Sequence, residues 1–227
     1  MHHKAETHGH GDAAPETAGS TIRWARWYDA ASWLLSFGRA GAIRKDIVKI
    51  ANPQPGESAL DVGCGTGTLA IMMRKYAGGR LDITGIDAAV EMVDVARKKA
   101  EKANQEIRFE AAVIESLPFA DGQFDLATST YMLHHLPAEV KRAGLREVRR
   151  VLKPGGRFLA VDFASSGGGI AGHLLSAFGH AHAASSFPEF EVMLREAGFT
   201  TVREVATKRK QLMFVMASAP AGAGKER

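Results

Sequence analysis

Three glycines at alternate positions, Gly63, Gly65 and Gly67, form a turn whose residue types suit ligand binding. The turn follows a short β-prone run at 59–62 and precedes a helical apolar pattern that begins at Leu69. Glycine adopts positive φ angles and lacks a Cβ, so a ligand can approach the main chain, and the helix that follows offers N–H groups. The pattern indicates either a nucleotide-type ligand at the carboxyl end of a strand or a turn needed only for packing.

A carboxylate at Asp87 favours ligand binding. Asp87 ends an expected second strand at 81–86, about twenty residues beyond the glycines, where a carboxylate accepts hydrogen bonds from both hydroxyls of a ribose. The glycine pattern is G-x-G-x-G and is preceded by Asp61, whereas dinucleotide-binding enzymes carry G-x-G-x-x-G. Two strand ends are therefore expected to meet one nucleoside.

With these residues the chain resembles the class I S-adenosylmethionine-dependent methyltransferases, in the small-molecule branch of methyltransferase type 11 and the ubiquinone and menaquinone methyltransferases. Segments 115–125, 132–136 and 147–157 resemble later motifs of that branch, in the same order. The resemblance covers roughly residues 22–217. It implies an enzyme that takes a methyl group from S-adenosyl-L-methionine and releases S-adenosyl-L-homocysteine.

The resemblance also implies a set of cofactor contacts, with one departure from the family pattern. Val113 stands where the third-strand motif usually carries an aspartate, so we expect backbone groups of Ile114 and the carboxylate of Glu115 to serve the adenine amino group. Cys64, the single cysteine of the chain, is expected to pack in the glycine turn and not to act as a nucleophile. The expected cofactor-binding residues are Tyr28, Asp61, Gly63, Cys64, Gly65, Thr66, Gly67, Asp87, Ala88, Met92, Val113, Ile114, Glu115, Ser129 and Met132.

Two histidines and one aspartate are the candidates for acid–base catalysis. His134 and His135 follow the fourth expected strand, and Asp162 ends the fifth, its neighbour in the sheet order that the resemblance implies. A carboxylate beside an imidazole fixes its tautomer and stabilises the imidazolium, and sugar O-methyltransferases of this branch carry a similar set. The alternative is structural: a histidine before Leu136 caps or packs against the next helix, and Asp162 satisfies loop N–H groups.

Substrate contacts are expected from two segments that these motifs do not fix. One is an aromatic-rich helix at 22–37, and the other is an insertion at 164–186, whose glycines suggest a hinge and whose apolar part suits a lid. Such a lid fits a small apolar or aromatic acceptor, although both segments can instead simply cover the core. The expected substrate-binding residues are Trp24, Tyr28, His134, His173 and His180.

Length and composition agree with one globular domain. The chain has 227 residues, 45% of them hydrophobic, and its net charge of +4 is spread over the sequence, so no nucleic-acid partner is expected. A single cysteine and the absence of a membrane-spanning apolar run predict a cytoplasmic protein without stable membrane insertion. No metal site is expected, because histidine-rich leaders such as 1–20 are usually unordered. The oligomeric state stays open.

The order of apolar patterns predicts a doubly wound α/β fold. The resemblance implies that its sheet is the mostly parallel, seven-stranded sheet of the Rossmann-like methyltransferase fold, with an N-terminal helical cap. The last two strands are expected to pair antiparallel, the ending that the resemblance also implies. Helices are expected at 22–37, 40–51, 66–77, 89–103, 138–152 and 187–198, and strands at 58–62, 81–86, 107–112, 124–129, 157–163, 201–207 and 211–217. The expected organisation is a disordered leader at 1–20, one methyltransferase domain at 21–218 with a cap at 21–51 and a lid at 164–186, and a loose tail at 219–227.

We therefore expect methyl transfer to a small-molecule acceptor, with O-methylation slightly favoured and a His/Asp base removing the acceptor proton. A quinone-type C-methyltransferase is the nearest alternative, because an apolar lid suits an isoprenoid tail. A nucleic-acid methyltransferase is disfavoured, since the amino-directed enzymes carry Asn/Asp-Pro-Pro-aromatic where residues 129–132 read S-T-Y-M. An alternative of another class is a regulatory protein that binds S-adenosylmethionine without catalysis, which the departure at Val113 favours.

Overall fold

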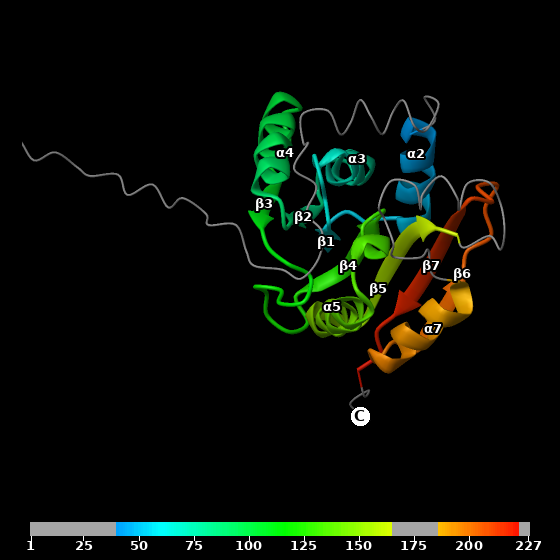
Figure 1. Cartoon of the computed structure of the whole chain (residues 1–227). Helices are drawn as coiled ribbons and strands as arrows, with labels where there is room; N and C mark the ends of the chain where they lie inside the picture. The colour runs from blue at the N-terminus through cyan, green and yellow to red at the C-terminus, as the bar shows by residue number, and fades with distance from the viewer. Residues whose placement is uncertain (1–39, 165–185, 223–227) are drawn as a thin grey trace, which may run out of the picture.

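The computed structural model describes residues 40–164 and 186–222, which form a layered α/β domain around one sheet (Figure 1). Its strands are β1 (Ser58–Val62), β2 (Asp82–Asp87), β3 (Arg108–Ala111), β4 (Phe124–Thr130), β5 (Leu152–Phe163), β6 (Thr201–Glu204) and β7 (Leu212–Ser218). The seven strands lie in the order β3-β2-β1-β4-β5-β7-β6. β1 to β5 run parallel, and β7 pairs antiparallel with both β5 and β6. The predicted mostly parallel sheet with its antiparallel ending is confirmed.

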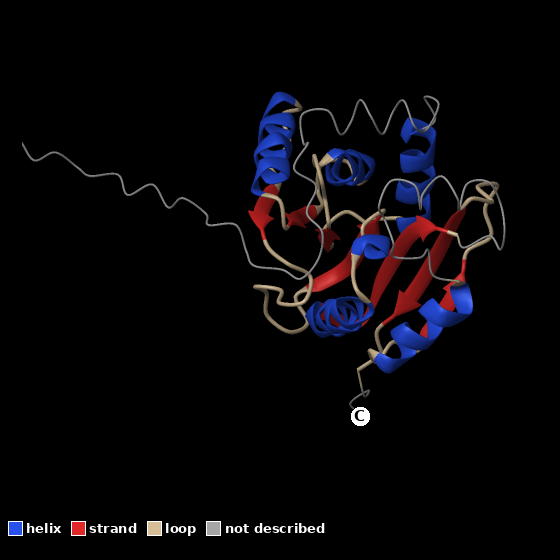
Figure 2. Cartoon of the chain, viewed as in Figure 1, coloured by secondary structure: helices blue, strands red, loops and turns tan. Residues whose placement is uncertain are grey.

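Helices cover both faces of this sheet (Figure 2). One face carries α2 (Ala40–Ala51), α3 (Thr68–Tyr76) and α4 (Val90–Lys102), and the other carries α5 (Ala138–Val151) and α7 (Phe187–Glu196). A short 3-10 helix, η1 (Leu133–His135), connects β4 to α5. In the part of the chain that the structure describes, no helix has the length and apolar character of a membrane span.

The hydrophobic core has two halves because successive side chains of a strand point to opposite faces of the sheet. Along β1, Ala59 packs with the α2–α4 layer, whereas Leu60 packs with the α5–α7 layer. Each helix packs an apolar stripe against the sheet; in α5 this stripe contains Leu145, Val148 and Val151. Both helix layers are thereby anchored to the same strands.

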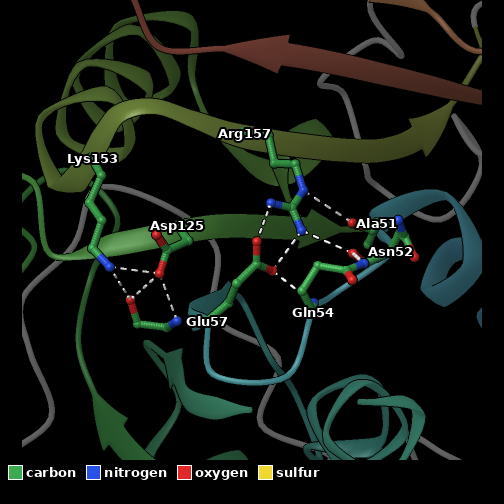
Figure 3. Close-up of polar contacts among 8 residues, drawn as sticks. Ala51, Asn52, Gln54, Glu57, Asp125, Lys153 and Arg157 are labelled. Carbon is green, nitrogen blue, oxygen red and sulfur yellow. Dashed lines mark hydrogen bonds and ion pairs between the residues drawn. The ribbon is translucent and has the colours of Figure 1, made fainter. Parts of the chain in front are cut away.

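Ion pairs hold the amino ends of the central strands together (Figure 3). The Arg157 guanidinium of β5 donates to both carboxylate oxygens of Glu57 at 2.7 Å, and also to two backbone carbonyls at the carboxyl end of α2. Lys153 donates to Asp125 at 2.7 Å and to the Ser58 hydroxyl at 3.2 Å. Because these contacts lie at the amino ends of β1 and β4, the carboxyl ends of the same strands remain for the candidate site.

Two strand boundaries differ from prediction by more than one residue. β5 begins at Leu152 and not at 157, because Leu152 already pairs with Phe124 before a register shift that absorbs the Pro-Gly-Gly segment. β6 ends at Glu204 and not at 207, because its ladder with β7 stops there.

The first residues of the tail predicted to be loose at 219–227 are packed against the domain. Ala219 is 2% exposed, and its N–H donates to the carbonyl of Gly156 at 2.8 Å. The N–H of Gly155 donates to the carbonyl of Pro220 at 3.0 Å. These two bonds extend the contact between β7 and the start of β5, so Ala219 and Pro220 belong to the packed domain. The leader, the helix expected at 22–37 and residues 165–185 of the expected lid lie outside the described residues.

Candidate cofactor-binding and catalytic site

The glycine turn lies between β1 and α3, at the carboxyl edge of the sheet. Gly63, Gly65 and Gly67 have φ angles of 70°, 53° and 73°, which glycine adopts without strain. A Cβ at Gly63 would lie 2.6 Å from Cγ of Met132, and one at Gly67 would lie 2.7 Å from Cζ of Phe109. Internal packing therefore already requires two of the three glycines, so the case for a ligand has to come from the groups around the turn.

Asp87, at the end of β2, shapes this turn. Its Oδ2 accepts a hydrogen bond from the Gly65 N–H at 2.8 Å, and its Oδ1 accepts one from the Ala89 N–H at 3.0 Å. Burial raises the pKa of Asp87 above its ordinary value, and the two N–H bonds act in the opposite direction. A carboxylate has about four acceptor positions, so these two bonds leave room for ligand hydroxyls. Ala88, the next residue, is half-buried, and Met92 is buried one turn further on.

Asp61 and Ser129 carry buried oxygens that have no hydrogen-bond partner among the described residues. Asp61 Oδ1 accepts a bond from the Thr128 hydroxyl at 2.7 Å, but Asp61 Oδ2 and Ser129 Oγ are unpaired. Burial raises the pKa of Asp61 to about 7, although the Thr128 bond lowers it. Orphaned polar atoms of this kind are rare in folded proteins, and a ligand is one explanation for them.

The neighbouring Cys64 has the character of a packing residue. Its side chain is buried, and burial raises the pKa of the thiol well above the usual value, with Asp61 and Asp87 adding to the effect. The thiolate is the nucleophilic form of cysteine, so this environment keeps Cys64 unreactive. Thr66, at the end of the turn, is also buried, and its hydroxyl accepts a hydrogen bond from Lys99 at 2.9 Å.

The segment that follows β3 lies next to Asp87, because the Ala112 N–H donates to the Asp87 carbonyl at 3.1 Å. Val113 and Ile114 are buried, and Glu115 is half-buried. A Cβ at Gly144 of α5 would lie 2.7 Å from Cγ1 of Ile114, so the Ile114 side chain fills the space beside that helix. The side chain of Ile114 thus serves packing, which leaves its backbone groups and Glu115 for the expected adenine contact.

β4 ends in a strained turn. Tyr131 has a φ of 55°, which is an unusual conformation for a bulky residue. Such strain costs about 1–3 kcal/mol and clusters at functional sites. The Tyr131 N–H donates to the Val161 carbonyl at 2.9 Å, and its ring lies 5.4 Å from that of Phe163. The turn places Met132 against Gly63, so the ends of β4 and β1 touch. The strain at Tyr131 could not be predicted from the sequence.

His134 and Asp162 form a close buried pair between neighbouring strand ends. Asp162 Oδ1 lies 2.6 Å from Nδ1 of His134, and Asp162 Oδ2 accepts the His134 backbone N–H at 2.9 Å. Asp162 Oδ1 also accepts the backbone N–H of Phe163 at 2.9 Å, which fixes the carboxylate further. An ionised carboxylate only accepts hydrogen bonds, so Nδ1 carries the imidazole proton and Nε2 is left as the basic nitrogen.

His135 stacks on this pair. Its ring centroid is 3.8 Å from that of His134 at an interplanar angle of 42°, and the side chain is half-buried. The Phe163 ring meets His134 edge-on at 5.1 Å. His134 is therefore held from several sides, by the Asp162 carboxylate and by the rings of His135 and Phe163.

Lys141 and Thr128 are further polar residues at the site that sequence reasoning missed. Lys141 is only 6% exposed and lines a small cavity of about 10 Å³ together with His134 and Asp162. Its signal was present in the sequence: Lys141 occupies the inward stripe of α5 that continues with Leu145. Thr128 has no comparable signal, because its partner Asp61 is 67 residues away.

The expected substrate contacts Trp24, Tyr28, His173 and His180 lie outside the described residues. The structure therefore brings together the glycine turn, Asp87, the segment 113–115, and the His134–Asp162 pair. In the described ranges, no group of three or more His, Cys, Asp or Glu side chains is arranged to hold a metal ion.

Comparison with known proteins agrees with this geometry. Residues 59–156 match a family model described as a methyltransferase domain. A demethylmenaquinone methyltransferase of Thermus thermophilus is 39% identical over 136 residues, which are 60% of each chain. The ubiquinone/menaquinone biosynthesis C-methyltransferase UbiE of Bdellovibrio bacteriovorus is 35% identical over 136 residues, covering 60% of this chain and 57% of the relative. The chain thus spans about three fifths of the length of these curated relatives.

The fold is also similar to that of a solved methyltransferase. The crystal structure of a SAM-dependent methyltransferase from Aquifex aeolicus superimposes with a TM-score of 0.63 at 23% identity, covering 77% of this chain and 88% of the other. At that identity the likeness concerns the fold, while the matching domain model and the curated relatives concern the family. S-adenosylmethionine is the cofactor of this family. Residues 59–156 thus match a methyltransferase domain, and the chain is similar to class I S-adenosylmethionine-dependent methyltransferases in sequence and in fold.

Proposed function

We propose that this protein transfers the methyl group of S-adenosylmethionine to a small acceptor that carries an ionisable hydroxyl group. The observation that supports this most directly is the pairing of His134 with Asp162 at the ends of β4 and β5, because β4 lies directly beside β1, the strand that leads into the glycine turn. A base in that position suits an acceptor that must lose a proton.

The residues at the sheet edge fit the donor. Asp87 has acceptor positions left for the ribose hydroxyls, and the turn from Gly63 to Gly67 presents main chain to the methionine end. The orphaned oxygens of Asp61 and Ser129 are acceptors beside the same turn. Backbone groups of residues 113–115, with Glu115, are assigned to the adenine. Met92 and Met132 are assigned to the apolar surround.

When bound, S-adenosylmethionine supplies a methyl group that is already activated by its attachment to a sulfonium. The chain's own residues then have three tasks: to align the acceptor oxygen with that methyl group, to exclude water and to take up one proton. Nε2 of His134 takes the hydroxyl proton, and Asp162 stabilises the imidazolium that results. The half-buried His135 stacks on His134 and limits its rotation.

A quinone-type C-methyltransferase is the second candidate. Two curated relatives, at 39% and 35% identity, are named as menaquinone-pathway methyltransferases, which supports this candidate about as well as O-methylation is supported. The two reactions share their first step, because an aromatic hydroxyl that has lost its proton is nucleophilic at oxygen and at the adjacent ring carbons. The position of the acceptor over the donor then decides which atom is methylated.

The test is methyl transfer from donor labelled with ¹³C on its methyl group to a panel of acceptors. The panel contains a hydroquinone with an isoprenoid tail, a catechol, a simple aliphatic alcohol and a primary amine. We expect turnover only with the aromatic hydroxyl compounds. The ¹³C shift of the product distinguishes a methoxy carbon from a ring methyl carbon. Turnover with the amine alone, or no binding of the donor in equilibrium dialysis, would contradict the proposal.

A further inference from the structure

A buried lysine lines the same cavity as the His134–Asp162 pair. Lys141 belongs to the first turn of α5, and its side chain is directed inward, with only 6% of the residue exposed. It lines a cavity of about 10 Å³ with His134 and Asp162, and the remaining wall is made by the apolar residues Leu133, Ala160, Phe190 and Met213. A buried lysine is rare unless a carboxylate compensates its charge.

Two carboxylates near Lys141, those of Asp162 and Glu189, differ in their burial. Asp162 and Glu189 both attract the ammonium group, which partly opposes the lowering of the Lys141 pKa by burial. Glu189 lies at the exposed start of α7, where it forms a capping box with Ser186. Asp162 is 7% exposed and shares the apolar cavity with Lys141. Because attraction between charges is stronger away from water, Asp162 is the more important of the two partners.

We propose that Lys141 is a positioning residue for His134 that acts through Asp162. The ammonium group compensates the negative charge of Asp162, with which it shares the cavity. The carboxylate then remains an ionised acceptor that holds the proton on Nδ1, but it attracts a second proton to the ring less strongly. Nε2 of His134 thereby stays available to accept a proton. This assignment rests on the proposed role of His134 as the base.

Four charged or titratable groups of the described residues lie around the pair. These are His135 from η1, Lys141 from α5, Asp162 from β5 and Glu189 from α7. Of these four, Lys141 is the one that carries positive charge near neutral pH. Its removal should therefore favour the imidazolium form of His134.

The experiment uses the full chain with ¹⁵N-labelled histidine, in the absence of donor and acceptor. The imidazole ¹⁵N signals report the tautomer and protonation of each ring, and the signal lost in His134→Gln identifies His134. Lys141→Met and Lys141→Gln remove the charge, Lys141→Arg retains it, and Arg142→Met removes a charge from the same turn of α5 at a partly exposed position that pairs with Glu139 and Glu196.

We expect the Nδ1–H tautomer of His134 in the parent chain at pH 7.5. In Lys141→Met and Lys141→Gln, the imidazolium form should persist to a pH about one unit higher, and the acid limb of the pH–rate profile should move in the same direction. Lys141→Arg and Arg142→Met should behave as the parent does.

Unchanged histidine signals in folded Lys141→Met and Lys141→Gln would overturn the proposal. Should neither variant fold, the parent chain still decides, since an Nε2–H tautomer of His134 there would also overturn it. Because the spectra need no methyl transfer, they separate this inference from the proposed function. The expected shift without turnover on any acceptor would remove the proposed reaction and leave the Lys141–Asp162–His134 arrangement in place.

Discussion

Thr128 donates its hydroxyl hydrogen to Asp61 across the two central strands, at 2.7 Å and out of contact with water. The bond joins β4 to β1 at the point where the strand order reverses, which is where open α/β sheets bind their ligands. It satisfies one oxygen of Asp61 and leaves the other without a partner among the described residues. Asp61 is therefore a buried carboxyl group with an incomplete set of hydrogen bonds.

Asp61 should make the protein less stable as the pH rises from about 4 to about 7. Burial raises its pKa to about 7 in the folded chain, from an ordinary value of 3.8. The folded state thus holds a proton that the unfolded state releases in this window, so the free energy of unfolding falls by up to about 4 kcal/mol and then levels off. Urea unfolding of the parent and of Asp61→Asn at pH 5 and pH 8 measures this. Asp61→Asn should lose most of the difference in unfolding free energy between pH 5 and pH 8, whereas Asp82→Asn, at an exposed carboxylate, should keep that difference.

Asp87→Ala should weaken donor binding at least tenfold. The variant loses the expected bonds to the ribose, each about 1.5–3 kcal/mol when charge-assisted, and it also releases the Gly65 and Ala89 N–H groups that shape the turn. Titration calorimetry with S-adenosylhomocysteine measures the affinity without any turnover. Asp94→Ala, at an exposed position of α4, is the matched control and should bind as the parent does. Equal affinity in Asp87→Ala would show that the ribose lies elsewhere.

Replacement of His134 should lower turnover far more than donor affinity. General bases contribute about 10²- to 10⁴-fold to a rate, and His134 is the histidine held by a carboxylate. We expect kcat to fall by about that factor in His134→Ala and in Asp162→Asn, and by less in His135→Ala, which removes the ring that stacks on His134. Steady-state kinetics at saturating donor provide the measurement. A larger effect in His135→Ala would transfer the role of base to that residue.

The sequence was sufficient to predict the elements and the local parts of the site. The glycine turn and Asp87 follow from patterns within one strand-turn-helix unit. The meeting of His134 with Asp162 also required the sheet order, which came from the resemblance to a family and which the structure shows.

Features that depend on long-range register were not predictable in the same way. The Thr128–Asp61 bond exists because two strands 67 residues apart in sequence align side by side. The early start of β5 arises because a Pro-Gly-Gly segment that is typical of a turn is absorbed as a register shift opposite Phe124. Lys141 was overlooked for a different reason: a lysine on an amphipathic helix is usually solvated, so its place on the inward stripe of α5 was not taken as a sign of burial.

Gly144→Ala should destabilise the protein, although alanine is the better helix former. A Cβ at this position of α5 would meet three carbons of Ile114 at 2.7–2.9 Å, so either the helix or the segment after β3 must shift. Such overpacking costs about 1–3 kcal/mol, more than the helix propensity that alanine adds. Thermal unfolding measures the loss. Gly41→Ala in α2 is the matched control, because a Cβ there meets nothing within 4 Å, and it should be neutral or slightly stabilising.

Because Ile114 belongs to the segment assigned to the adenine, Gly144→Ala should also weaken donor binding, which Gly41→Ala should leave unchanged. Loss of stability with unaltered affinity would indicate that residues 113–115 do not contact the adenine.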